Sequence, residues 1–198
     1  MQRVILAVLA LTAFATPVAG QQSRWELGLR FHATAFRGVS EGVGTAITAI
    51  RPSAGNAFGF ELSRRFGSWD AALVTDYLGS SFEAVAPDVT VRTPGSAFDR
   101  ARLGFVLART AARLGSLEAR IGIGPMLDWW AAGGGSDRAV IGGEVQLGLR
   151  LRTGRMTLQN GVAFGASASP VAADELPDGF ESRGLRSIAF MAQLRFGL

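Results

Sequence analysis

The sequence predicts an all-β fold: an eight-stranded antiparallel up-and-down transmembrane β-barrel with a polar interior filled by side chains. Two observations carry this prediction. Most of the chain alternates between large apolar residues and small or charged residues with a period of two, the repeat of a β-strand. The expected strands are joined alternately by tight turns and by long polar connections. Each strand of a membrane barrel has an apolar outer face and a polar inner face, which explains the alternation. Short turns at one end and longer loops at the other are also typical of such barrels.

The first twenty residues predict a cleaved secretory signal peptide (1–20), which leaves 21–198 as one outer-membrane barrel domain. Arg3 precedes an apolar run at 4–15, and the small residues Val18 and Gly20 lie three and one positions before Gln21. The run is well short of the roughly 20 apolar residues that a spanning helix requires. We therefore expect an exported chain.

The composition excludes several kinds of site. There is no cysteine, so disulfides, thiolate metal ligands and cysteine catalysis are excluded. All 20 basic residues are arginine, but they are interleaved with 16 acidic residues and give a net charge of only +4. Nucleic-acid binding would need a basic cluster, so we expect no nucleic-acid partner. We also expect no cofactor and no metal site.

The first expected strand runs over 24–36, and its large apolar residues share one face. A polar, glycine-bearing connection at 37–56 follows, with a strand-like part at 45–50. Connections of this length are exceptional in compact soluble domains, but they are normal on the extracellular side of outer-membrane barrels.

The next two strands form a hairpin whose predicted turn is Gly67 and Ser68. A single register places aromatic residues opposite one another on the outer face and opposite charges opposite one another on the inner face. The predicted pairs are Phe66 with Trp69, Arg65 with Asp70, Leu62 with Leu73, and Phe58 with Tyr77.

Five more strands complete the barrel. A connection at 82–98 leads into a strand at 99–114, whose apolar residues change face and therefore require a bulge within 109–112. The remaining expected elements are a turn at Gly115 and Ser116, a strand at 117–129, a loop at 131–137, a strand at 141–152, a turn at Thr153 and Gly154, a strand at 156–165, a loop at 168–184 and a last strand at 187–198.

The two faces decide between a membrane barrel and a secreted barrel of the lipocalin kind, which places charge outside and apolar groups inside. Here the face with the bulky residues is nearly free of charge, so it predicts contact with lipid. The opposite face predicts an interior charge network of Glu26, Arg30, Glu61, Arg65, Asp70, Arg102, Glu118, Arg120, Asp128, Glu144, Arg150 and Arg195. The predicted aromatic girdle is Trp25, Phe66, Trp69, Tyr77, Trp129 and Phe196, and we interpret Trp130 as part of the same belt.

The export signal, the eight alternating strands, the short turns opposite long loops and the amphipathic last strand resemble the small outer-membrane barrels of the OmpA membrane domain, OmpX and OmpW kind. The resemblance implies the cell envelope of a Gram-negative bacterium and a porin-like architecture. It also implies that the barrel-assembly machinery recognises the C-terminal strand, which here ends in Leu198 with Phe196 on the same face.

His32 is the single histidine and invites an enzymatic interpretation. Some small outer-membrane barrels modify lipid A, and resemblance to the deacylases would require His and Ser two residues apart on a lipid-facing edge. Here Thr34 follows His32, and both side chains are expected to point inward. We therefore expect no enzymatic activity and no catalytic residue.

The expected function is a non-enzymatic structural or surface-interaction role of a monomer in the outer membrane, exerted through the extracellular loops. An eight-stranded barrel leaves a lumen that side chains just fill, which argues against a pore. The alternatives are a narrow OmpW-like uptake channel for small apolar compounds and a lipid A-modifying enzyme. The expected partners are outer-membrane lipid, lipopolysaccharide and the barrel-assembly machinery.

Overall fold

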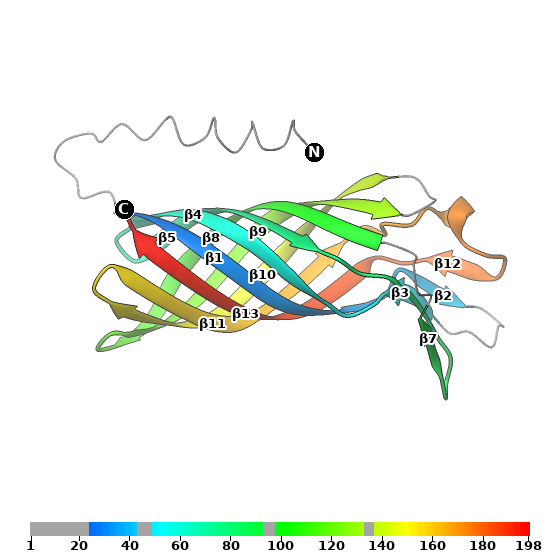
Figure 1. Ribbon diagram of the computed structural model, residues 1–198, viewed down its shortest axis with the longest axis horizontal. Helices are drawn as coiled ribbons and strands as arrows, with labels where there is room; N and C mark the ends of the chain where they lie inside the picture. The colour runs from blue at the N-terminus through cyan, green and yellow to red at the C-terminus, as the bar shows by residue number, and fades with distance from the viewer. Residues whose placement is uncertain (1–23, 43–48, 93–97, 133–136) are drawn as a thin grey trace.

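The computed structural model describes residues 24–42, 49–92, 98–132 and 137–198, and its long strands close into a barrel. The expected signal peptide at 1–20 lies outside these residues. The barrel is all-β, as the sequence predicts (Figure 1). Its eight strands are β1 (Arg24–Arg37), β4 (Gly55–Phe66), β5 (Trp69–Leu78), β8 (Phe98–Leu114), β9 (Leu117–Ala132), β10 (Arg138–Thr153), β11 (Met156–Ser167) and β13 (Leu185–Gly197).

The strand order around the barrel is β1-β13-β11-β10-β9-β8-β5-β4, and each strand pairs antiparallel with both neighbours. Chain neighbours are therefore also neighbours in space, and β1 pairs with β13 to close the sheet. This is the predicted up-and-down topology. All four predicted pairs of the β4–β5 hairpin are confirmed, from Phe66 opposite Trp69 to Phe58 opposite Tyr77.

The three tight turns each begin with a glycine that has a positive φ, namely Gly67 at 62°, Gly115 at 60° and Gly154 at 60°. Glycine at the first central position is the requirement of a type II′ turn, whose twist matches that of the flanking strands. The first two turns are those predicted. The third is shifted by one residue from the prediction, because Thr153 pairs with Met156 and the turn is Gly154 and Arg155.

The predicted bulge in β8 is confirmed, since its pairing with β9 shifts between Thr110 and Ala112. On one side of the bulge Phe105 faces outward, and on the other side Leu114 faces outward opposite Leu117. The extra residue reverses which face the following side chains take, so Leu103, Phe105 and Leu107 before the bulge and Leu114 after it all face outward.

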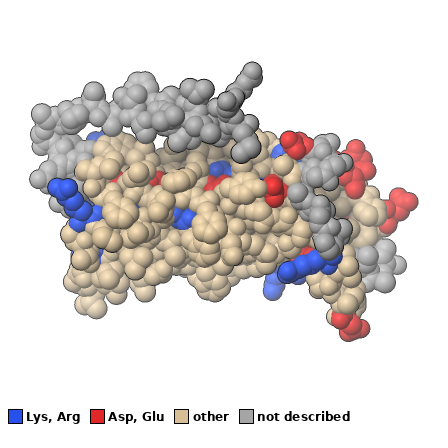
Figure 2. Space-filling view, in the orientation of Figure 1, with Lys and Arg blue, Asp and Glu red and all other residues tan. Residues whose placement is uncertain are grey.

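The outer face of the barrel is apolar, and many of its large side chains are exposed. Phe58, Ile123 and Phe190 have 66%, 62% and 67% of their surfaces exposed, whereas Arg30 on the inner face has 3%. The visible middle of the barrel is mainly tan in Figure 2, with small blue and red patches, and the larger charged groups lie toward the two ends. A surface of this kind is stable in hydrocarbon and not in water.

A second, five-stranded sheet lies over the loop end of the barrel and was not predicted (Figure 1). Its order is β12 (Phe180–Ser182), β2 (Ser40–Gly42), β3 (Ala49–Pro52), β6 (Phe82–Val85) and β7 (Thr90–Arg92). A 3-10 turn, η2 (Ala173–Glu175), belongs to the loop before β12. The sequence predicted a strand-like part at 45–50, of which 45–48 lie outside the described residues and 49–50 belong to β3.

The first strand begins and the last strand ends at the tight-turn end of the barrel, where the Leu198 backbone N–H donates to the Trp25 carbonyl over 2.9 Å. An even-stranded outer-membrane barrel has its termini on this periplasmic side. Within the described residues, no helix has the length and apolar character needed to cross a membrane.

Candidate functional site

The barrel lumen is the candidate site, because the charged side chains of the strands converge there. The structure places all twelve residues of the predicted network on the inner face. Eleven of them are buried, and the side chain of Arg65 is 10% exposed. Alternation puts them inside: their chain neighbours point outward and carry the apolar side chains.

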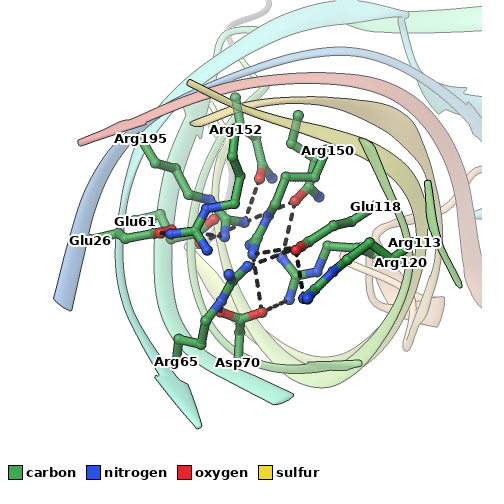
Figure 3. Close-up of polar contacts among 12 residues, drawn as sticks. Glu26, Glu61, Arg65, Asp70, Arg113, Glu118, Arg120, Arg150, Arg152 and Arg195 are labelled. Carbon is green, nitrogen blue, oxygen red and sulfur yellow. Dashed lines mark hydrogen bonds and ion pairs between the residues drawn. The ribbon is translucent and has the colours of Figure 1, made fainter. Parts of the chain in front are cut away.

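Near the tight turns, Asp70 and Glu118 are the acceptors of a cluster of arginines (Figure 3). Arg65 donates from Nη2 to Glu118 over 3.0 Å and from Nε to Asp70 over 3.4 Å. Arg120 and Arg150 also bind Asp70, the latter over 3.3 Å. We call these five residues the tight-turn cluster. Its members come from β4, β5, β9 and β10, so it ties together strands on different sides of the barrel.

Further ion pairs extend the tight-turn cluster around the same end of the lumen. Arg113, at the rim, binds Glu118 over 2.9 Å. On β13, Arg195 contacts Glu61 over 2.8 Å, while Arg152 contacts Glu26 over 3.5 Å. These groups point toward one another across the lumen in Figure 3.

Farther along the lumen, Arg102 is the centre of a second group. Its guanidinium forms a two-pronged contact with Asp128, over 2.6 and 3.0 Å, and donates to Glu144 over 2.7 Å. Gln146 donates to the other oxygen of Glu144 over 2.7 Å. A planar guanidinium that meets a carboxylate with two parallel bonds holds it in a fixed orientation.

Seven arginines and seven acids lie within the described lumen, and Arg113 and Arg152 add two arginines near the tight-turn rim. The seven arginines are Arg30, Arg65, Arg100, Arg102, Arg120, Arg150 and Arg195, and the seven acids are Glu26, Glu61, Asp70, Asp76, Glu118, Asp128 and Glu144. An unpaired buried charge is very costly, so this balance is a condition for a stable interior. Asp76 and Arg100 extend the predicted network, and they form an ion pair of 2.9 Å.

At the loop end, the lumen is closed by aromatic rings rather than by charges. Trp130 stacks on Phe98 at 4.7 Å between ring centroids and meets Phe36 edge-on at 5.8 Å, while Phe82 of β6 covers Phe98 at 4.1 Å. We call these four rings the aromatic cap. The other residues of this apolar cluster are Val39, Ala57, Leu78, Val140, Val171, Leu176 and Leu185.

The assignment of Trp130 to the interface belt is wrong. Trp130 is 1% exposed, whereas Trp129 is 44% exposed and lies on the outer face as predicted. The alternation along β9 predicts this difference, because successive side chains of a strand point to opposite faces. The same parity could have identified Phe36 and Phe98 as inward-facing rings.

Arg100 lies where the aromatic cap meets the charged interior. Its Cζ is 5.8 Å from the ring centres of both Phe36 and Trp130, and its guanidinium donates to Asp76. Beside Arg100 and Arg102 the lumen retains a cavity of about 10 Å³. This is room for about one water molecule.

The middle of the lumen also contains apolar packing. Val74, Val106 and Met126 are each at most 3% exposed and pack with Ala72 on the inner face of β5, β8 and β9. The interior is therefore filled by side chains at three levels: the tight-turn cluster, this mixed middle layer and the aromatic cap.

His32 lies inside the barrel with 1% of its surface exposed, and its Nε2 accepts a hydrogen bond from Arg30 over 3.1 Å. Thr34 is also buried on the inner face. A catalytic His needs a carboxylate or carbonyl that orients it toward a nucleophile. The hydrogen bond recorded for His32 joins it to a cation instead. Among the described residues, no three His, Asp or Glu side chains form a group suited to a metal ion.

The residues of the predicted girdle lie near the two edges of the outer face. Trp25, Phe66, Trp69 and Phe196 lie at the tight-turn end, where Phe66 is directly opposite Trp69. Tyr77 and Trp129 lie at the loop end, on either side of Ala101 in one row of the sheet. The Tyr77 hydroxyl donates to Asp99 over 2.7 Å.

The closed barrel is similar in fold to solved structures of outer-membrane proteins. Neisserial surface protein A (NspA) superposes with a TM-score of 0.60 and 13% identity, covering 88% of this chain and 97% of that one. The chain has the fold of a small eight-stranded outer-membrane β-barrel. The outer membrane protein AlkL, solved in DMPC lipid bilayers, superposes with a TM-score of 0.52 and 12% identity, covering 93% of this chain and 94% of that one. No protein-family model and no curated protein matches the sequence.

Proposed function

We propose that the protein is a non-enzymatic, integral outer-membrane protein whose barrel is an anchor and whose loop-end sheet is its working surface. The observation that carries this proposal is the contrast between a filled lumen and an ordered structure above it. The tight-turn cluster and the aromatic cap fill the two ends of the described lumen, and a separate sheet lies beyond the loop end of the barrel.

The outer face supports the location in a membrane. A charged side chain at the bilayer midplane costs about 2–4 kcal/mol, and the outward positions of the barrel strands are nearly free of charge. The long connections of such barrels are extracellular and the tight turns periplasmic. The sheet of β12, β2, β3, β6 and β7 is therefore the part exposed to the medium.

The loop-end sheet supports a role in contacts with other molecules. Five strands from three connections pair with one another, and this end of the molecule carries the exposed acids Asp88, Asp174, Glu175, Asp178 and Glu181. Red side chains gather at this end in Figure 2. Loops fixed on a rigid scaffold are a common location of binding surfaces. In this proposal the protein is a monomer surrounded by membrane lipid. The barrel-assembly machinery recognises β13.

Two measurements test this proposal. Outer-membrane fractionation with heat-modifiable migration on a gel tests location and fold together. Planar-bilayer recordings of the refolded protein test the closed lumen, for which we expect no reproducible channels. Steady single-channel conductance would contradict the anchor role, and a freely soluble processed chain would contradict the location.

A second candidate, a lateral uptake route for small apolar compounds, is favoured by a hollow of about 470 Å³ on the outer wall. Leu29, Phe31, Phe58, Phe60 and Leu194 line this hollow, and Ala192 is its smallest side chain. Ligand sites of small molecules have volumes of about 300–1,000 Å³ and mostly apolar linings. Uptake of a small apolar solute into liposomes, lost in an Ala192→Trp variant that fills the hollow, would favour this candidate over the anchor.

A further inference from the structure

Two arginines lie directly opposite each other on the outer face at the loop end of the barrel. Arg37 ends β1, Arg186 is the second residue of β13, and the register pairs one with the other. Both side chains are exposed. Their chain neighbours Phe36 and Leu185 are 3% exposed and belong to the cap cluster, so the arginines point to the opposite, outer face.

This pair is unfavourable without a further group. Side chains directly opposite each other in an antiparallel sheet have Cβ atoms about 5 Å apart, and like charges in that position destabilise the pairing. Among the described residues, neither Arg37 nor Arg186 takes part in a hydrogen bond between side chains, an ion pair or a contact with an aromatic ring. The two positive charges therefore lack a partner within the described chain.

The outward arginines at the other end differ in this respect. The Cζ of Arg64 lies 5.5 Å from the Trp25 ring and 4.9 Å from the Phe66 ring, and the Cζ of Arg109 lies 5.5 Å from the Trp69 ring. Contacts of this kind stabilise a guanidinium at the edge of a membrane. Arg64 and Arg109 thus have partners in their own chain, whereas the described residues give no such partner to Arg37 or Arg186.

The surface beside Arg37 and Arg186 has room for a large head group. The same row of the sheet continues from Arg186 to Ala166 of β11 and Gly143 of β10. Both are exposed, so the row places two guanidinium groups beside a smooth shelf of small residues. With neighbouring strands about 5 Å apart, the row of four positions spans roughly 14 Å.

The height of the pair on the barrel indicates what it contacts. The next outward residues toward the middle of the barrel are Ala35 and Ile188, and Phe190 follows with 67% of its surface exposed. Arg37 and Arg186 thus lie between the apolar belt and the loops, at the level of lipid head groups. Two adjacent guanidinium groups suit a phosphate, which accepts parallel N–H bonds and neutralises the repulsion.

We propose that Arg37 and Arg186 form a binding site for a phosphate group of a phosphorylated glycolipid in the outer leaflet, whose sugar lies on the shelf of Ala166 and Gly143. The inference rests on the proposed outer-membrane location, since that location supplies the ligand. It assigns a ligand class to one row of the barrel wall and leaves the loop-end sheet available for other contacts.

The test compares two double variants of the full chain that remove the same charge. Arg37→Gln with Arg186→Gln removes the proposed site, and Arg64→Gln with Arg109→Gln is the matched control at the opposite end. Each protein is purified in a mild detergent and titrated with lipopolysaccharide, with dephosphorylated lipopolysaccharide and with inorganic phosphate, and the bound lipid is counted by native mass spectrometry. Outer-membrane fractionation and heat-modifiable migration are recorded for the same preparations.

We expect the first variant to bind lipopolysaccharide at least about tenfold more weakly than the natural sequence, the loss that follows from removing two charge-assisted contacts. The control should stay within about twofold, and a change of Arg37 and Arg186 to Lys should give an intermediate affinity because the paired donors are lost while the charge is kept. Removal of the phosphates from lipopolysaccharide should weaken its binding to the natural sequence as much as the two glutamine substitutions weaken the binding of intact lipopolysaccharide.

Equal affinity of the glutamine variant and the natural sequence overturns the inference, as does equal binding of dephosphorylated lipid. If inorganic phosphate competes as strongly as the glycolipid, the site is one for free phosphate and the glycolipid assignment is wrong. If the glutamine variant does not fold, the inference is still tested by the affinity of the charge-conserving lysine variant and by the binding of dephosphorylated lipopolysaccharide to the natural sequence. Failure of the proposed function gives a different result from failure of this inference: the protein with the natural sequence would then be found outside the outer-membrane fraction.

Discussion

The two ends of the lumen are closed by different chemistry. At the tight-turn end, Asp70 and Glu118 bind long arginine side chains from strands far apart in the sequence, as in the contact between Asp70 and Arg150. At the loop end, Trp130 and Phe98 close the barrel together with Phe82, which comes from the loop-end sheet. The stability of the charged end depends on each buried charge having a partner of opposite sign. The stability of the aromatic end depends on the apolar area that is buried and on the folding of the loops.

The largest expected effect comes from Asp70→Ala, which removes the common acceptor of Arg65, Arg120 and Arg150. Breaking a buried charge group in this way leaves uncompensated guanidinium ions, so we expect a loss of about 3–5 kcal/mol in the free energy of unfolding. Urea unfolding in detergent, followed by heat-modifiable migration, measures it. Asp88→Ala, at an exposed acid of the β6–β7 hairpin, is the control and should change stability by less than about 0.5 kcal/mol. A loss below about 1 kcal/mol for Asp70→Ala would refute the role of the charged closure.

Trp130→Ala tests the aromatic cap. It removes a buried ring, and we expect a loss of about 3 kcal/mol, the smaller end of the range for such changes, because the loops can relax into the space. The matched control is Trp129→Ala, whose side chain lies on the outer face next to it in the chain. If urea unfolding shows the two variants to be equally stable, the cap does not hold this end of the barrel.

A smaller effect is expected at His32, which lies between the two closures. His32→Ala removes the acceptor of the Arg30 hydrogen bond, so we expect a loss of about 1–2 kcal/mol. Lipid A from cells that produce the natural sequence or the variant should have the same acyl pattern by mass spectrometry. A modification of lipid A that requires His32 would instead support the enzymatic alternative.

The same difference between the two ends determines what the sequence could predict. Period-two alternation places Arg65 and Asp70 inside and Phe66 and Trp69 outside, and a glycine at the turn determines the register, so the hairpin and its charge pair follow from local pattern. The turn after β10 was misplaced by one residue because Thr153, Gly154 and Arg155 allow either position until the pairing of Thr153 with Met156 is known.

The loop end was harder to predict for a physical reason. Strands β2, β7 and β12 have three residues each, and β2 and β12 pair between different connections, so neither length nor alternation identifies them. The inward position of Trp130 follows from the alternation along β9, but Phe82, which covers its neighbour Phe98, lies in a connection without a repeating pattern. Contacts that depend on the path of long loops are not encoded in local periodicity.

The central claim is that the alternating apolar residues of the barrel strands face hydrocarbon. The chain has no cysteine, so single replacements such as Phe60→Cys, Leu147→Cys and Phe190→Cys, with Ala163→Cys on the inner face as control, each accept one spin label. The most direct measurement is the accessibility of these labels to oxygen and to a water-soluble nickel chelate after reconstitution into lipid vesicles. We predict high oxygen and low chelate accessibility at the three outward positions and low accessibility to both reagents at position 163. Chelate accessibility at the outward positions that equals that of a label in water would contradict the account.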